Sequence, residues 1–258
     1  MPSRAKSNDS SNDSPCDPAP HRPRRFATTR WSLIAAAGQA RSPDARRALA
    51  ALCEAYWYPL YAFVRRRGYS VEDAQDLTQA FFGELLEKDR LRAADRERGR
   101  FRSFLLASLE NFLANQWRRA SAAKRGGGRL PISLDLERGE NQYRLEPAHE
   151  LTPEKLYERR WALTMLEQAL ARLREEFAER DKLDLFDRLQ PCLGGDKRSL
   201  PYGPLAADLG MTEAAIKVAV HRLRRRYREI LRAEIAETVS SPEEIDDELR
   251  DLFRALAE

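Results

Sequence analysis

The sequence has few of the residues that build disulfide frameworks or metal sites. Its three cysteines, Cys16, Cys53 and Cys192, lie far apart, and no CxxC or His-x-x-x-His spacing accompanies the three histidines. This pattern predicts neither a disulfide framework nor a zinc site, and we expect no metal and no cofactor. It fits a protein that works in a reducing cytoplasm.

Long apolar runs are missing as well. No run of about 18 uncharged apolar residues occurs, and the N-terminal residues lack the apolar core of a signal peptide. We therefore expect no membrane insertion and a cytoplasmic location. Residues 1–25 are rich in Ser, Asn, Asp and Pro with almost nothing apolar, so they are predicted to form a disordered tail.

Neither sign of charge is in large excess. The 258 residues include 45 Lys and Arg and 41 Asp and Glu, which gives a formal net charge of +4. The charged residues therefore have to be examined where they cluster, because local patches decide what a surface binds. With 42% apolar residues, the chain can build one or two hydrophobic cores.

Helical signals dominate what is present, and few runs look like strands. The Ser-Pro-Asp motif at residues 42–44 predicts a helix start, Gly68 follows a basic helix end, and Ser70 with Asp73 forms a capping box. Residues 120–154 lose the helical periodicity and contain KRGGGRLP, so they are predicted to be a flexible linker. We therefore expect an all-α protein with two helical domains joined by this linker.

Residues 211–231, MTEAAIKVAVHRLRRRYREIL, combine many basic residues with a regular apolar stripe. A short helix candidate that closes at Gly210 precedes them, and Thr212 is well placed as N-cap. The apolar stripe should face a core, while polar and basic residues recur on the opposite side. This is the layout of a helix-turn-helix, whose second helix enters the major groove of DNA. The alternative is a solvated basic helix.

Within this helix, two groups of side chains have different expected roles. Lys217 and His221 lie near its N-terminal end and are candidate base readers. The arginines that follow suit phosphate contacts, because a guanidinium matches phosphate oxygens and carries no sequence information by itself. The predicted DNA contacts of this segment are Thr212, Glu213, Lys217, His221, Arg222, Arg224, Arg225 and Arg228, with Arg226 as a further phosphate contact.

A second amphipathic segment, GRFRSFLLASLENFLANQWRRA, places Phe101, Leu105, Leu109, Phe112 and Leu113 on one side. The other side carries Asn and Arg side chains, which can read base edges and support unpaired bases. This face could therefore hold separated DNA strands. An ordinary amphipathic helix is the open alternative, since Asn and Arg are routine on solvent faces. The polar side carries Ser108, Asn111, Asn115 and Arg118.

With these residues in view, LCEAYWYPLYAFVRRRGYSVEDAQDLTQAFFGELLE followed by RFRSFLLASLENFLANQWRR resembles region two of extracytoplasmic-function (ECF) sigma factors of bacterial RNA polymerase. LAADLGMTEAAIKVAVHRLRRRYREIL resembles region four of the same family. The likeness covers most of residues 48–119 and 161–235. It implies a non-enzymatic initiation factor, without catalytic residues, that gives core RNA polymerase its promoter specificity.

The resemblance also implies a division of labour between the helices. The DAQDLTQAFFGELL helix would dock on the largest β-type polymerase subunits, through Asp73, Asp76, Gln79 and Phe82. The helix around Asn111 would read and melt the minus-ten element, and the helix-turn-helix would read the minus-thirty-five element. The implied contacts to the melted element are Arg100, Ser108, Asn111, Asn115, Arg118 and Arg119. The implied units are a disordered tail (1–25), region two with an extra N-terminal helix (26–119), the linker (120–154), region four (155–239) and an acidic C-terminal helix (240–258).

The chain departs from the family pattern in several places. Family members commonly carry acids where Gln75 and Ala80 stand, which makes docking weaker or conditional. Phosphorylation of Thr78 by a Ser/Thr kinase would restore that negative charge, whereas the alternative is that Thr78 is an ordinary helix residue. Val218 and Ala219 replace the polar residues that usually follow the lysine, and residues 178–203 are longer than the usual spacer. The helix containing Trp31, Leu33 and Ile34 is expected to pack on region two.

The C-terminal segment SSPEEIDDELRDLFRALAE is expected to form an acidic helix from about Pro242, with Ser241 as its N-cap. Its acidic face could cover the basic recognition helix and so partly inhibit the free protein, although packing onto region four or docking of a partner is at least an equal alternative. An inhibitor protein is a further candidate partner. Core RNA polymerase and promoter DNA are the expected partners. A stand-alone helix-turn-helix regulator is the alternative function. A recombinase or nuclease is disfavoured, because no nucleophile or carboxylate cluster lies beside the basic surfaces.

Overall fold

The computed structural model describes residues 43–87, 100–120, 135–146, 151–194, 202–239 and 241–257. Every regular element in these ranges is a helix, so the all-α class is confirmed for this part of the chain. The predicted tail (1–25) and the helix around Trp31 lie outside the described residues. The elements are α2 (Pro43–Arg66), α3 (Val71–Glu87), α4 (Phe101–Ala120), α5 (Leu136–Tyr143), α6 (Pro153–Ala178), α7 (Leu183–Leu189), η3 (Gln190–Cys192), α8 (Tyr202–Asp208), α9 (Glu213–Ala236), η4 (Pro242–Glu244) and α10 (Ile245–Ala257).

The turn between α2 and α3 forms as predicted. Gly68 has a φ of +91°, in the left-handed region that glycine reaches without a steric cost. Ser70 Oγ accepts from the backbone N–H of Asp73 at 3.0 Å and lies 2.9 Å from the Asp73 carboxylate. These local contacts close α2 and start α3, which then runs to Glu87.

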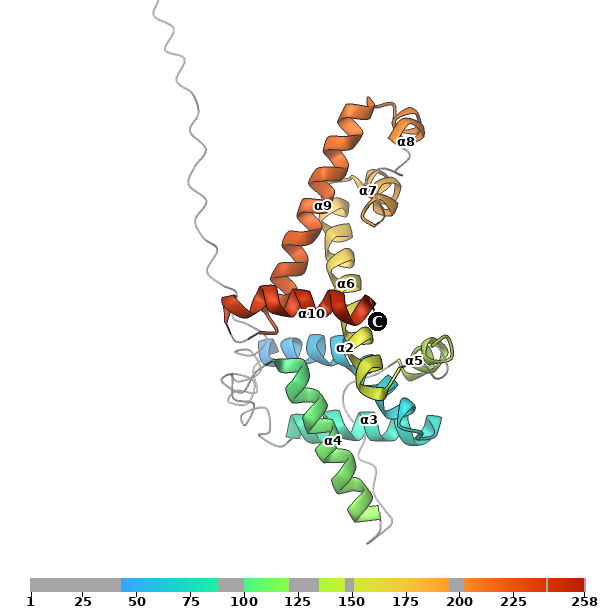
Figure 1. The fold of residues 1–258 in the computed structure, drawn as a ribbon, viewed down its shortest axis with the longest axis vertical. Coiled ribbons are helices and arrows are strands. Elements are labelled where there is room, and N and C mark those ends of the chain that lie inside the picture. The colour runs from blue at the N-terminus through green and yellow to red at the C-terminus, as the bar shows by residue number, and fades with distance from the viewer. Residues whose placement is uncertain are drawn as a thin grey trace, which may run out of the picture.

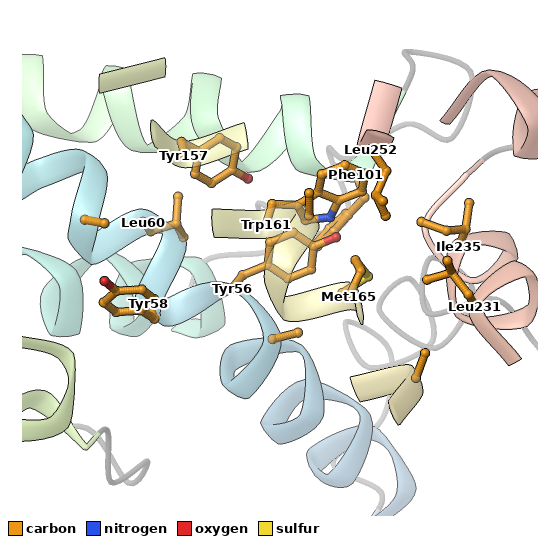
Figure 2. Close-up of a cluster of buried hydrophobic side chains, with 14 of the residues drawn as sticks. Tyr56, Tyr58, Leu60, Phe101, Tyr157, Trp161, Met165, Leu231, Ile235 and Leu252 are labelled. Atoms are coloured by element: carbon orange, nitrogen blue, oxygen red, sulfur yellow. The ribbon is translucent and has the colours of Figure 1, made fainter. Parts of the chain in front are cut away.

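One long helix, α6, connects the two halves of the molecule. Its N-terminal half packs along α2 and its C-terminal half packs along α9 (Figure 1). Trp161 and Met165 of α6 are completely buried beside Tyr56 of α2 (Figure 2). The hydroxyl of Tyr157 donates to the backbone carbonyl of Arg102 at 3.0 Å and ties α6 to the start of α4.

The segment predicted as a flexible linker contains a helix that is fastened to α2. The buried Glu140 of α5 accepts hydrogen bonds from Tyr61 at 2.6 Å and from Arg65 Nε at 3.0 Å. Glu146, just after α5, accepts from Tyr58 at 3.0 Å. Residues 135–146 within this segment are therefore structured although they lack helical periodicity, because polar contacts rather than an apolar stripe hold α5 in place.

The helix-turn-helix stands at the far end of a long hairpin. Figure 1 shows α9 running antiparallel to α6, with α8 at the tip and α10 crossing the base. Leu231 and Ile235 at the end of α9 and Leu252 of α10 are buried in the same apolar cluster as Tyr56 and Trp161 (Figure 2). A single cluster of buried side chains thus runs from α2 to α10, and the arrangement of two domains on a flexible linker is not confirmed.

Candidate nucleic-acid interface

The turn between α8 and α9 has the local geometry that the sequence predicted. Gly210 has a φ of +61°, and the N–H of Met211 donates to Ala206 O at 2.9 Å to close α8. Thr212 has an extended backbone, and its Oγ1 accepts from the N–H of Ala215 at 3.2 Å, so Thr212 is the N-cap of α9. A short helix, a tight turn and a longer helix follow one another, as in a helix-turn-helix.

The apolar stripe of α9 faces the core, as predicted. Ile216, Val220, Leu223 and Ile230 are buried, and the hydroxyl of the half-buried Tyr227 donates to Leu166 O of α6 at 3.1 Å. The burial of this face leaves the opposite side of α9 directed away from the core. The exposed residues on α9 include the predicted contacts Glu213, Lys217, His221, Arg222, Arg225 and Arg228.

Lys217, the predicted base reader, is exposed and has only weak local partners. Its Nζ lies 3.6 Å from Glu213 Oε2 and 5.6 Å from the centre of the Tyr202 ring. Glu213 is exposed and Tyr202 is only partly buried, so their hold on the ammonium group is small. Val218 beside it is 50% exposed, an unusual position for an apolar side chain. Apolar contact with a thymine methyl group is one recognition role open to such a residue.

Two of the predicted DNA contacts on α9 are engaged within the protein instead. Arg224 donates from Nε to Cys192 O at 2.8 Å and from Nη2 to Gly194 O at 3.2 Å. Its assignment as a DNA contact is therefore corrected, because residues 183–194, which include α7 and η3, bring backbone carbonyls against α9. Arg224 thus ties the segment around η3 to α9.

Arg226 is the second correction. Its Nε donates to Glu176 Oε2 of α6 at 2.8 Å, and its Nη1 to Glu229 at 3.1 Å. The hydrogen bond from Arg226 lowers the pKa of Glu176, and the same bond raises the pKa of Arg226. Both groups therefore stay charged at neutral pH. The position of α6 was invisible in the local sequence, so this arginine looked free for phosphate.

The polar side of α4 forms a second exposed surface. Asn111 and Arg118 are exposed, whereas Ser108 and Asn115 are half-buried at its margins. Arg118 Nε donates to Ala114 O at 3.3 Å, which lays its side chain along the helix. Arg119 belongs to α4, but its side chain lies outside the described part of the molecule.

Trp117 was missed by the sequence reasoning as a site residue. Its side chain is 72% exposed, the most exposed tryptophan or phenylalanine in the described part of the chain. No clear signal in the sequence marked it, because Trp117 follows Leu113 by four residues and so continues the spacing of the apolar stripe. A large exposed aromatic ring next to Arg118 is a suitable platform on which an unpaired base can stack.

Arg100, predicted to contact the melted DNA element, is paired with the C-terminal helix. Its Nε lies 2.9 Å from Glu248 Oε2, and its Nη1 contacts Asp251. In this conformation Arg100 is occupied by these two acids, because α10 packs against α6 and brings them to the start of α4, and its contact with DNA stays a prediction. The neighbouring Arg102 donates to Glu248 Oε1 at 2.8 Å.

The acidic side chains near the start of α3 form an exposed acidic surface. Asp73 and Asp76 are exposed and Gln79 is half-buried, so these predicted docking residues share an accessible side. Phe82 is the exception, because its side chain is completely buried and its ring lies 5.6 Å from that of Phe81. Its assignment as a docking residue is corrected: Phe82 is part of the core.

Thr78 is also misplaced by the sequence prediction. Its side chain is 0% exposed, and its hydroxyl has no hydrogen-bond partner among the described residues. A kinase must reach the hydroxyl of its substrate residue, so Thr78 is not a phosphorylation site in this conformation. The helical pattern placed Thr78 near the docking acids, but α2 and α4 cover that side of α3.

The C-terminal helix forms as predicted, with two differences. The Ser241 side chain makes no capping bond to the backbone, and the chain enters α10 through the short η4. Phe253, expected in the apolar stripe, is 57% exposed.

The predicted cover over the exposed face of α9 is wrong. Helix α10 packs on α6, on the start of α4 and on the far end of α9, where Asp246 pairs with Arg232.

The described residues bring together no three His, Cys, Asp or Glu side chains that could hold a metal ion. Cys53 and Cys192 are buried free thiols, and burial raises the pKa of Cys53 to about 12. Over the same ranges, none of the helices has enough continuous apolar length to cross a bilayer. Comparisons with protein-family models, with characterised proteins and with solved structures found no match to this chain.

Proposed function

We propose that the protein is a sigma-type transcription initiation factor that binds core RNA polymerase and promoter DNA. The observation that carries this proposal is the presence, on one helical scaffold, of two different exposed surfaces whose side chains suit DNA. One is the exposed basic side of α9 behind a capped helix-turn-helix. The other is the exposed side of α4 with Asn111, Trp117 and Arg118.

The two surfaces suit different forms of DNA. The α9 surface presents one helix end with Lys217 and Val218, which fits the major groove of a duplex. The α4 surface combines an amide, an indole ring and a guanidinium, which fits unpaired bases and their backbone. A factor that opens DNA needs both, because it first binds a duplex and then holds a separated strand.

The acidic start of α3 supplies a surface for a protein partner. Asp73 and Asp76 are exposed there, and a basic helical partner would complement them. In the proposed function this partner is the core polymerase. A stand-alone helix-turn-helix regulator would use α9 alone and would leave the α3 and α4 surfaces without a role.

Transcription with purified core polymerase tests the proposal. The protein should co-purify with the core enzyme and start transcripts at a cognate promoter. Asp76→Lys should weaken co-purification, whereas Asp184→Lys, the same change at an exposed acid of α7, should not. A protein that binds duplex DNA but never the core enzyme would be a stand-alone regulator, and the proposal would be wrong.

The α4 surface is tested by strand opening. Asn111→Ala and Trp117→Ala should reduce permanganate reactivity of unpaired thymines at the start site, while leaving co-purification with core polymerase intact. Asn141→Ala provides the control, because Asn141 is an exposed asparagine on α5, away from α4. Unchanged reactivity in both α4 variants would remove this surface from the proposed mechanism.

A further inference from the structure

The C-terminal helix α10 holds the start of α4 through a compact group of charges. Glu248, only 1% exposed, accepts from Arg102 Nε at 2.8 Å and lies 2.9 Å from Arg100 Nε. Asp251 contacts Arg100 and lies 3.3 Å from Arg102 Nη2. Two acids of α10 thus form ion pairs with two arginines that lie about 150 positions earlier in the chain.

Arg100 continues the exposed side of α4. Asn111 and Arg118 follow it after 11 and 18 residues, which is about three and five helical turns, so the three share one side of the helix. The residues between them on that side, Ala107 and Ala114, are exposed and small. A strand lying along Asn111 and Arg118 would therefore reach Arg100 at the far end, about 27 Å away along the helix.

The apolar attachment of α10 is modest for a helix of this length. Only Ile245 and Leu252 are buried, while Leu249 and Leu256 are partly exposed and Phe253 is 57% exposed. Much of the contact between α10 and α4 is therefore ionic. The ion pairs do not break readily without a replacement, because leaving a buried arginine without an anion costs free energy. The carboxylates can be exchanged for another anion, and a phosphate offers the same paired oxygens as a carboxylate.

The contacts of Arg102 with α6 keep the start of α4 in place when a phosphate replaces the carboxylates of α10. The Arg102 guanidinium lies 4.5 Å from the centre of the Trp161 ring and also donates to Glu158 of α6 at 3.1 Å. These contacts belong to α6 and do not depend on α10. Arg102 therefore keeps a neutralising partner when Glu248 leaves, whereas Arg100 pairs with Glu248 and Asp251, which both belong to α10.

We propose that α10 is a displaceable latch whose Glu248 and Asp251 occupy the phosphate-binding end of α4, and that the backbone of single-stranded DNA takes their place at Arg100. The latch lowers the affinity of the free protein for unpaired DNA. The inference rests on the proposed function for the identity of the ligand. It concerns a contact that the family resemblance does not describe.

Binding of a fluorescein-labelled single strand of about 15 nucleotides to the full chain tests the latch. Asp251→Asn weakens the hold on Arg100 and should tighten binding by about fivefold. Asp247→Asn is the matched control, because it removes the same charge from α10, whereas the Asp247 side chain pairs with Arg250 of the same helix and not with α4 in the described structure. Its binding should stay within about twofold of the unsubstituted protein. Arg100→Ala in the Asp251→Asn protein should abolish the gain.

Hydrogen–deuterium exchange measures displacement in the unsubstituted protein and so avoids any folding defect of a variant. Adding the single strand at saturation should accelerate exchange of the amides of residues 241–257. Equal tightening by Asp251→Asn and Asp247→Asn, or unchanged protection of α10 at saturation, would overturn the latch. Neither measurement contains polymerase, so a protein that releases α10 on the strand but starts no transcripts would refute the proposed function and leave the latch standing.

Discussion

The Tyr61 hydroxyl donates to Glu140 Oε2 over 2.6 Å, and this bond joins α2 to a helix 79 positions further along the chain. Arg65 Nε donates to the same oxygen at 3.0 Å. Burial by itself would raise the pKa of Glu140, but the hydrogen bonds from Arg65 and Tyr61 outweigh it, so the pKa is lowered. The carboxylate is therefore the form that stabilises the folded protein.

Glu140→Gln should reduce the free energy of unfolding at pH 7 by about 2 kcal/mol, because it weakens two hydrogen bonds to a charged acceptor. The folded pKa is lowered, so the stabilisation is present above the unfolded pKa of about 4.3 and is lost as the pH falls through the folded value. Urea unfolding of both proteins at several pH values measures this. A difference that does not shrink in acid would contradict the assigned cause.

Gly139→Ala should detach α5 from α2. A Cβ at this position would lie 2.6 and 2.8 Å from two atoms of the rigid Trp57 ring, too close for any real contact. Overpacking of this kind costs about 1–3 kcal/mol, which outweighs the gain of replacing a glycine in a helix. Gly203→Ala in α8 is the control, since its Cβ would meet only the flexible Glu213 side chain at 3.2 Å. Thermal unfolding should separate the two variants clearly, and equal melting temperatures would refute the contact.

Thr78→Val should leave the protein folded and raise its free energy of unfolding by about 1 kcal/mol. The Thr78 hydroxyl is buried without a hydrogen-bond partner among the described residues, so its removal relieves a desolvation cost. Thr78→Glu should unfold or strongly destabilise the protein, because it buries a charge in an apolar site. Denaturant unfolding measures both changes. A stable, fully folded Thr78→Glu protein would restore this residue as a candidate switch.

Three substitutions on α9 should have three different outcomes. Lys217→Ala should weaken binding to a cognate promoter by about 1–3 kcal/mol with little effect on unrelated DNA, as expected of a base reader. Arg225→Ala should weaken binding to all sequences alike, as expected of a phosphate contact. Arg224→Ala should instead lower the melting temperature, because this residue donates to Cys192 O and Gly194 O. Competition binding with duplexes of both kinds, together with thermal unfolding, distinguishes them. A sequence-independent loss with Lys217→Ala would remove it as a reader.

Local features were predictable from the sequence because they depend on neighbours within one turn. Ser70 before α3, Thr212 before α9 and the glycines at 68 and 210 form the caps and turns that their residue types favour. The apolar stripe of α9 also faces the core, since the period of 3.6 residues decides which side chains share a face. These are the parts of the helix-turn-helix that the sequence by itself determined.

Tertiary structure alone decided which neighbour covers each remaining face. Thr78 and Phe82 are buried. Arg224 is bonded to the segment around η3, Arg226 to α6, and Arg100 is paired with α10. Helical periodicity places a side chain on a face but does not say what packs there, and the partner of Arg100 lies about 150 residues away. The packing of α5 on α2 was unpredictable for the same reason. It depends on single polar contacts such as Tyr61 with Glu140, and such contacts produce no periodic pattern in the sequence.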